Sequence, residues 1–182
     1  IHGDILKINL PELIEQKEFF NYKVIANIPY YITSPIIQLF LETKYLPKEM
    51  ILMVQKEVAQ RICEKPGNMS ILAVSVQYYT RPELLFYVPK TVFWPIPEVD
   101  SAVIKISNLK PQTSKIESRN FFRIVKAGFC SKRKTLLNNL SNSFHLDKKI
   151  AEEKIKKAGI DPELRAQELS VADWKKLEIE FS

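Results

Sequence analysis

The pattern of apolar and polar residues changes partway along the chain. In the first part, short runs rich in β-branched residues alternate with segments whose apolar residues recur at helical spacing. Such runs are typical of strands buried inside a parallel sheet. Ser34 and Pro35 suit the N-cap and the first position of a helix. The pattern predicts strands at 23–27 and 50–54 and helices at 34–43, 55–64 and 70–79.

Two further apolar runs, at 83–88 and 102–107, have no helical segment between them. A proline-rich connection joins them, so we expect these two strands to be antiparallel. Strand–helix units that end in such a hairpin predict an α/β sheet with one reversed strand.

The second part of the chain has helical spacing throughout. Residues 110–118 (KPQTSKIES) are polar and interrupt the pattern, which indicates a linker. We therefore predict an incomplete α/β domain over residues 1–109 and a small α-helical domain over residues 110–182. The helices predicted in the second domain are 119–128, 132–142, 148–158 and 171–181.

Composition narrows the class of protein. The 182 residues are 46% hydrophobic and 26% charged, which is ordinary for a soluble globular protein. No run approaches about 18 consecutive apolar residues, so no membrane span is expected. The start lacks an initiator Met and the features of a signal peptide, and it suggests a chain that begins within a longer protein. Two distant cysteines predict neither a disulfide nor a zinc site, and they favour the cytoplasm.

The charge is unevenly distributed. Residues 1–109 contain 11 basic and 11 acidic residues, whereas residues 110–182 contain 16 basic and 10 acidic residues and carry the whole net charge of +6. A basic excess at one end indicates a polyanionic partner that binds there. A solvated helical surface is the alternative that charge alone leaves open.

The stretch KVIANIPYYITSP, residues 23–35, carries the candidate chemistry. Pro29 cannot donate a backbone hydrogen bond and biases Ile28 toward extended geometry, so the strand ends here. The carboxyl ends of parallel strands are where open α/β sheets bind ligands. There the Asn27 amide oxygen and the Pro29 carbonyl form two rigid acceptors that suit an exocyclic amine. Tyr30 offers a stacking face for the ring that carries this amine.

Adenine N6 is an amine of this kind. Its lone pair is delocalised into the ring, and two acceptors that pull the N6 hydrogens out of plane would localise the lone pair toward an electrophile. No strong base is needed because the ammonium product is acidic. Catalysis then rests mostly on positioning, which can supply about 7–11 kcal/mol. For four residues alone, a tight turn with a half-buried tyrosine is the structural alternative.

Several motifs together resemble one family. Residues 27–30 have the form of motif IV of S-adenosylmethionine-dependent amino methyltransferases. In order along the chain follow MVQKEVAQRI, LAVSVQYY, VPKTVFWPIPEVDSAV, AGFCSKRKTLLNNL and GIDPELRAQELSVADW. They are similar to the ribosomal RNA adenine N6,N6-dimethyltransferase family, above all to its bacterial small-subunit branch, which dimethylates two adjacent adenines near the 3′ end of that rRNA. The resemblance covers nearly all of the chain.

The resemblance implies a fold and a cofactor. It implies a Rossmann-like class I methyltransferase sheet with a reversed terminal strand, and S-adenosylmethionine as methyl donor with no metal. Asn27 would contact both cofactor and target amine, the Pro29 carbonyl would accept from the amine, and Tyr30 would stack on the base. Asp4, in Gly3-Asp4, would accept from the adenine amine of the cofactor. Taken alone, Asp4 could equally be a loop acid or a cap.

The loop FWPIPEVDS, residues 93–101, matches the F-x-P-x-P-x-V-D-S pattern of the family. The resemblance implies that Phe93 flanks the flipped base opposite Tyr30. Two prolines stiffen the loop and can hold an aromatic over a cleft at low entropy cost. A core plug under the hairpin is the alternative for Phe93, and we expect Asp100 and Ser101 to tie the loop.

The helical domain supplies the candidate RNA contacts. We expect residues 131–134 to continue a helix from the preceding segment, so that basic side chains neutralise phosphates in a salt-dependent manner. The resemblance implies a grip on small-subunit rRNA within the immature 30S-type subunit, a role in ribosome biogenesis, and a cytoplasmic protein; a monomer is the default. The predicted RNA-binding residues are Arg123, Lys126, Lys132, Arg133 and Lys134.

The sequence also departs from the family. Its four glycines form no G-x-G pattern, so the glycine-rich loop and the ribose-binding acid should lie upstream of Ile1. We expect this chain alone to bind S-adenosylmethionine poorly and to turn over little or not at all. A partial sheet also leaves an exposed strand edge.

Three alternatives stay open. The first is the macrolide-resistance type of adenine methyltransferase, which acts on large-subunit rRNA and shares two of the motifs. The second is a non-catalytic ribosome-assembly factor that docks through the basic domain. A DNA amino methyltransferase is third, and the basic helical end argues against it.

Overall fold

The structure is a computed structural model that describes residues 1–107, 109 and 115–182. The chain divides into two compact units. The sheet unit contains Ile1–Cys63 and Tyr79–Gln112, and the helical unit contains Glu64–Tyr78 and Thr113–Ser182.

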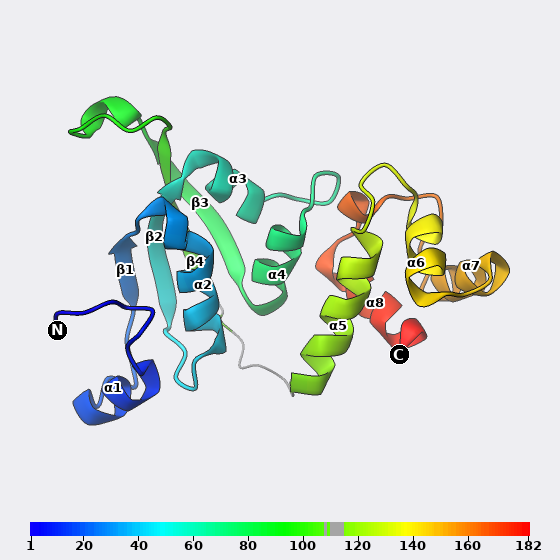
Figure 1. Ribbon diagram of the computed structural model, residues 1–182, viewed down its shortest axis with the longest axis horizontal. Helices are drawn as coiled ribbons and strands as arrows, with labels where there is room; N and C mark the ends of the chain where they lie inside the picture. The colour runs from blue at the N-terminus through cyan, green and yellow to red at the C-terminus, as the bar shows by residue number, and fades with distance from the viewer. Residues whose placement is uncertain (108, 110–114) are drawn as a thin grey trace. The chain divides into compact units, whose positions relative to one another are not determined.

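The sheet unit is built on a mixed sheet of four strands (Figure 1). The parallel pair β1–β2 and the two antiparallel pairs of β4 give the order β1-β2-β4-β3. The predicted reversed strand is therefore confirmed, and it lies inside the sheet between β2 and β3. The strands are β1 (Val24–Asn27), β2 (Glu49–Gln55), β3 (Arg81–Val88) and β4 (Ser101–Ser107).

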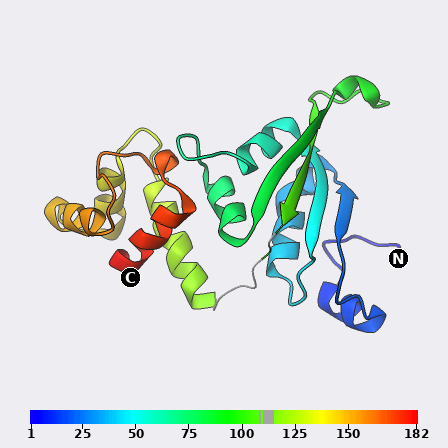
Figure 2. The same ribbon diagram turned by 180° about the vertical axis from the view of Figure 1, so that it is seen from behind.

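Helices cover one face of the sheet, whereas side chains on the other face are exposed. Helix α3 (Lys56–Ile62) packs on β2, β3 and β4, and α2 lies on the same face (Figures 1 and 2). On the opposite face, Ile25 is 75% and Phe86 is 56% exposed, and within the described part of this unit no helix covers them. The side chains that are fully buried on the covered face are Met50, Leu52, Val54, Ala102, Ile104 and Ile106.

Two helix starts in the sheet unit differ from the sequence prediction. Helix α2 (Thr33–Glu42) has Ile32 rather than Ser34 as its N-cap, because the 3₁₀ turn η1 (Tyr30–Ile32) leads directly into it. Helix α1 (Leu10–Lys17) was not predicted. Its N-cap Asn9 accepts a hydrogen bond from the Glu12 N–H at 3.5 Å, and Asn followed by Leu-Pro is the signal that could have shown it.

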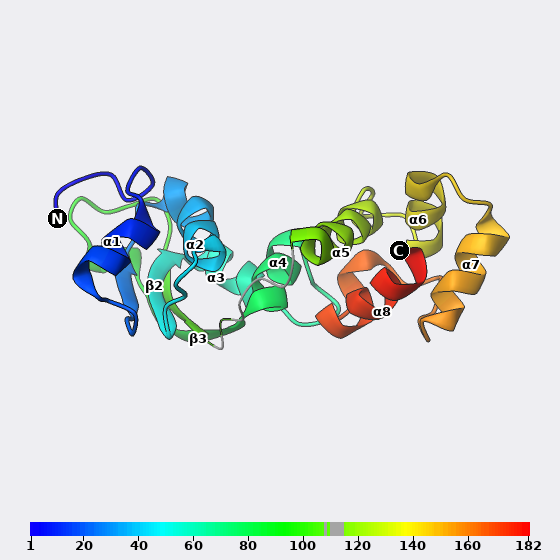
Figure 3. The same cartoon turned by 90° about the horizontal axis from the view of Figure 1, so that it is seen from below.

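The helical unit has its own core. Helix α5 packs on α6 and α8, and α7 packs on α6 and α8 (Figure 3). Its centre holds fully buried Phe121, Leu140, Ile155 and Trp174. The elements are α4 (Ile71–Tyr79), α5 (Lys115–Gly128), α6 (Leu136–Phe144), α7 (Lys148–Lys157), the 3₁₀ turn η3 (Ala166–Glu168) and α8 (Val171–Phe181).

Residues 64–78 group with the helical unit, although the sequence suggested a single boundary between residues 109 and 110. Ala73 and Val74 are fully buried in the same cluster as Phe121, and the Tyr78 ring centroid lies 4.0 Å from that of Phe121. The α4 sequence ILAVSVQYY contains no charge, and Ala73 and Val74 bury one side of this helix in the core of the helical unit.

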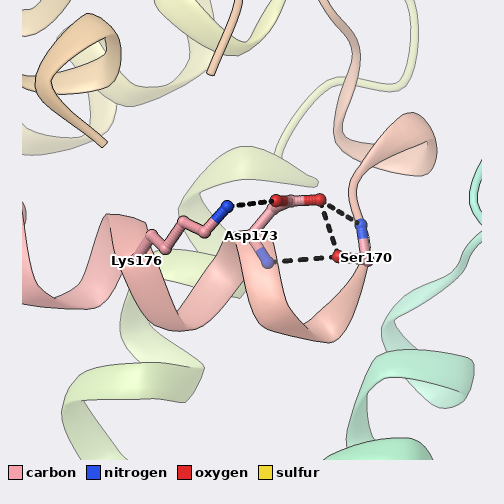
Figure 4. A network of polar contacts seen from close by, with 3 residues as sticks. All are labelled: Ser170, Asp173 and Lys176. Atoms are coloured by element: carbon pink, nitrogen blue, oxygen red, sulfur yellow. Dashed lines mark hydrogen bonds and ion pairs between the residues drawn. The ribbon is translucent and has the colours of Figure 1, made fainter. Parts of the chain in front are cut away.

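Helix α8 begins in a capping box (Figure 4). Ser170 Oγ accepts from the Asp173 N–H at 3.2 Å, and the Asp173 carboxylate accepts from the Ser170 N–H at 3.1 Å. Burial would raise the pKa of Asp173, but the hydrogen bonds from Ser170 and Lys176 outweigh it and the pKa lies below its usual value. The cap fixes the first turn of α8 and therefore the position of buried Trp174.

Candidate functional site

The predicted amine-binding motif lies at the carboxyl end of β1, as the sequence indicated. Asn27 is the last residue of β1, exposed and opposite Met53 of β2. Ile28 is buried and its N–H donates to the Met53 carbonyl at 3.4 Å. Pro29 is exposed and has no N–H to continue the ladder, so the strand ends there. Asn27 and Pro29 therefore both lie at the surface, which binding of a substrate amine requires.

The Pro29 carbonyl has a partner of its own. It accepts from the Ile32 N–H at 3.1 Å as η1 turns. A carbonyl oxygen has two lone pairs, so this bond fixes the direction of the carbonyl and leaves it capable of a second acceptance. That Asn27 and Pro29 act on one amine stays a prediction.

Tyr30 is held by its hydroxyl. The Tyr30 oxygen lies 2.7 Å from Ser101 Oγ, and Ser101 is the fully buried first residue of β4. The half-buried ring is thus fixed at its far end. This bond also ties the Asn27–Tyr30 turn to the end of the loop that carries Phe93.

Tyr30→Phe in the 182-residue chain is expected to lower the free energy of unfolding by about 1–2 kcal/mol, because it takes the partner from a buried hydroxyl. Ser101→Ala should cost less, because Tyr30 is less buried than Ser101 and its hydroxyl can more easily bind water instead. Urea denaturation of both variants measures the two losses. A larger loss for Ser101→Ala would contradict this account of the bond.

The loop between β3 and β4 is braced at its base. Asp100 Oδ1 accepts from the Lys90 N–H at 3.0 Å, and Lys90 Nζ donates to the Glu98 carbonyl at 3.2 Å. Lys56 Nζ lies 3.6 Å from Asp100 Oδ2. The bond from the Lys90 N–H is the main reason why the pKa of Asp100 lies below its usual value. Asp100 and Ser101 tie the loop, as predicted, whereas the part that Lys56 and Lys90 play was missed.

Phe93 is half-buried and ends the 3₁₀ turn η2 (Lys90–Val92). In the sheet register, Ser101 lies opposite Gln55 of β2 and Val88 of β3. The loop therefore leaves the sheet at the carboxyl end of β2, the end at which Asn27 also finishes β1. The structure brings the motif and the loop to one end of the sheet; that Phe93 flanks a base opposite Tyr30 stays a prediction.

Asp4 has the geometry of a turn acid. Its Oδ1 accepts from the Leu6 N–H at 3.0 Å, and its Oδ2 lies 3.8 Å from Lys7 Nζ. The carboxylate is half-exposed and can accept another hydrogen bond. Contact with the cofactor amine stays a prediction.

The basic residues of the helical unit are not equivalent. Lys126 is exposed in the last turn of α5. Arg123 donates to the Phe181 carbonyl at 3.5 Å and lies 5.1 Å from the Phe144 ring centroid. Those contacts indicate that Arg123 stabilises the end of α8, in addition to its predicted role in RNA binding.

The segment 132–134 corrects one prediction. Its basic residues, Lys132 to Lys134, are exposed in a turn between α5 and α6 instead of continuing a helix. Helix α5 ends at Gly128, and α6 begins after its N-cap Thr135, whose Oγ1 accepts from the Asn138 N–H at 3.4 Å. A turn still presents three cations together.

Buried Asn139 holds this turn, and the sequence analysis missed it. Its Nδ2 donates to the Gly128 carbonyl at 2.7 Å and to the Ser131 carbonyl at 3.0 Å. The signal was an amide on the apolar face of an amphipathic segment, where a buried polar group needs partners.

No helix of the described residues is long and apolar enough to cross a membrane. The same residues do not gather three or more His, Cys, Asp or Glu side chains as a metal site would.

Comparison with known proteins places this geometry in context. The model of the family "Ribosomal RNA adenine dimethylase" matches residues 1–182. A ribosomal RNA small subunit methyltransferase A of Dehalococcoides mccartyi (strain ATCC BAA-2100) is 45% identical over 100% of this chain and 62% of its own length. The protein of that name from Enterococcus faecalis is 42% identical over 97% of this chain and 63% of its own length.

Two solved structures share the fold. A dimethyladenosine transferase from Plasmodium falciparum has a TM-score of 0.75 and 26% identity, over 100% of this chain and 71% of that one. The 23S rRNA methyltransferase ErmE has a TM-score of 0.74 and 20% identity, over 100% and 70%. The expected Rossmann-like methyltransferase fold is confirmed, although the chain spans about 62% of the length of its Dehalococcoides relative. Because the family model matches from the first residue to the last, the chain belongs to the ribosomal RNA adenine dimethylase family.

Proposed function

We propose that the protein dimethylates N6 of two adjacent adenines near the 3′ end of small-subunit rRNA, with S-adenosylmethionine as methyl donor. The observation that carries the proposal is the exposed Asn27 and Pro29 at the carboxyl edge of the sheet, beside a Tyr30 ring fixed by Ser101. The names of the 45% and 42% identical relatives support the small-subunit substrate. The protein acts as a monomer in the cytoplasm on the immature small subunit.

The residues of this chain act on the base. In the first methyl transfer, Asn27 Oδ1 and the Pro29 carbonyl each accept one N6 hydrogen and turn the nitrogen out of the ring plane. In the second transfer, one of the two accepts the single hydrogen that remains. Tyr30 and Phe93 stack on the adenine and offset the cost of taking it out of its stack, which is on the order of a few kcal/mol. S-adenosylmethionine, when bound, would supply an electrophilic methyl group to N6 and would leave as the neutral thioether. N6 then gives up a proton to water.

The chain fits the cofactor in part. The half-exposed Asp4 carboxylate and the exposed Asn27 amide are acceptors that suit its adenine and ammonium groups. The sequence has no G-x-G turn for a close backbone approach. We propose that the part of the relatives that this chain does not match supplies that turn.

Phosphate contacts come from the helical unit. Lys126 and the turn Lys132–Lys134 are exposed, and each phosphate neutralised should add to the salt dependence of rRNA binding. Arg123 joins them with a part of its guanidinium, since one of its N–H groups is directed to Phe181.

The test uses an extended protein: the 182 residues preceded by the segment of the Dehalococcoides relative that they do not match. We expect the extended protein to stop reverse transcription at two adjacent adenines of small-subunit rRNA. The G-x-G turn and the ribose-binding acid, which the 182 residues lack, would each give the cofactor one hydrogen bond of about 1.5–3 kcal/mol. Their absence should weaken cofactor binding by the 182-residue chain by about 100-fold or more. The chain alone should therefore leave the rRNA almost unmodified.

Large-subunit rRNA serves as the matched control. Stops on that RNA instead would identify the macrolide-resistance type of activity, and stops on neither would contradict the proposal. Full turnover by the 182 residues alone would show that they contain the whole cofactor-binding site, which would contradict the assignment of part of that site to the unmatched segment.

A further inference from the structure

The loop between β3 and β4 exposes three apolar side chains that the proposed mechanism does not use. Val92 is 67%, Trp94 93% and Ile96 57% exposed, while Phe93 and Pro97 between them are half-buried. We call Val92, Trp94 and Ile96 the apolar crest. Figure 1 shows this loop extending beyond the end of β3. The other tryptophan of the chain, Trp174, is fully buried, so the exposure of Trp94 is specific to this loop.

The crest is preorganised. The base of the loop is closed by the bonds from Lys90 to Asp100 and to Glu98. Pro95 and Pro97 fix two backbone φ angles within it. A stiff loop loses little conformational entropy when a partner covers it, so the exposed indole is ready to bind without refolding.

The position of the crest indicates what covers it. Ser101 follows the loop directly and is hydrogen-bonded to Tyr30. The apolar crest and the amine-binding motif therefore lie at the same end of the sheet. The ammonium groups of Lys56 and Lys90 lie at the base of the loop, paired with Asp100 and the Glu98 carbonyl. Each ammonium has three donors, so both can also donate to an approaching phosphate backbone. An exposed indole with apolar residues two positions away on either side along the chain resembles the apolar wedges that proteins insert between nucleobases.

Base flipping creates the need for such a wedge. When one adenine leaves the stack, its neighbour loses a stacking partner. We propose that Trp94 stacks on the nucleobase adjacent to the target adenine, with Val92 and Ile96 at the edges of that base. This inference rests on the proposed function, and it makes Trp94 a residue that binds substrate without taking part in the methyl transfer.

The test is a double-mutant cycle between Trp94 and that nucleobase. The probes are an RNA hairpin with two adjacent adenines in its loop and the same hairpin with an abasic site beside the target. Trp94→Ala in the extended protein should weaken binding of the intact hairpin roughly 5- to 150-fold, which corresponds to about 1–3 kcal/mol. Trp94→Phe should recover most of the affinity. On the abasic hairpin, wild type and Trp94→Ala should bind alike.

The matched control is Ile179→Ala, which removes another strongly exposed apolar side chain, on α8, and should leave affinity unchanged. An equal loss on both hairpins would overturn the stacking, and so would a Trp94→Ala variant that binds like wild type. A wild-type dimer that Trp94→Ala converts to a monomer in sedimentation would assign the crest to a second copy and overturn it too. Binding needs no methyl transfer, so a failure of the proposed activity is seen separately in the reverse-transcription assay.

Discussion

Asn27→Ala in the extended protein is expected to lower the rate of adenine methylation by about 10²–10³-fold, the usual cost of removing one preorganised polar group from a reacting centre. The physical reason is that N6 would keep one acceptor, Pro29, and its lone pair would stay largely delocalised in the ring. Binding of rRNA should be unchanged, because the exposed cations of the helical unit lie on other elements. The measurement is single-turnover methylation of small-subunit rRNA beside a filter-binding assay.

Asn27→Asp is the matched control. It keeps an acceptor oxygen at the same place with almost the same volume, so its loss should be much smaller than that of Asn27→Ala. Equal losses would show that the amide N–H, and not the acceptor, is what matters. If Asn27→Ala abolishes methylation yet still restores assembly of small subunits in cells that lack the enzyme, the assembly role is the one that the cell depends on.

The site could be anticipated because its signal is local. A proline after an apolar run favours the end of a strand, because it cannot donate to the next strand, so Asn27 and Pro29 were expected at the end of β1. The reversed strand β4 followed from the lack of a helix between two runs. Its insertion between β2 and β3 could not be derived, because the order of strands depends on packing between residues far apart in sequence.

The conformation of residues 132–134 was harder to predict, because several weak structural preferences compete there. Lys132 to Lys134 are good helix formers, and their pattern favoured a continuous helix. In the structure the chain instead turns, since Thr135 caps α6 and Asn139 binds two carbonyls of the turn. Residues 64–78 show the same limit: nothing in an apolar helix tells which of two cores it joins.

Gly128→Ala in the 182-residue chain is expected to lower the unfolding free energy of the helical unit by about 2–3 kcal/mol, at the upper end of overpacking effects. A Cβ at this position would overlap Trp174 Cη2 and lie 2.9 Å from Cζ3. Neither the Trp174 ring nor the backbone at Gly128 can move easily to relieve this overlap. Trp174 is fully buried and its ring is stacked on Phe129, and Asn139 holds the Gly128 carbonyl. Urea denaturation followed by far-UV circular dichroism measures the change.

Two further variants make this prediction specific. Trp174→Phe shortens the ring that Gly128→Ala would meet, so the double variant should be at least about 1 kcal/mol more stable than the sum of the single losses predicts. Gly3→Ala is the matched control, because its Cβ would make only ordinary contacts with Ile8, at 3.8 Å to Cδ1 and 4.0 Å to Cγ1. It should change stability by less than about 0.5 kcal/mol. Strict additivity would mean that Gly128 matters for backbone freedom and not for the approach of the indole. Since α5 ends at Gly128 just before the basic turn, the same clash should also weaken rRNA binding by the extended protein and leave the sheet unit folded.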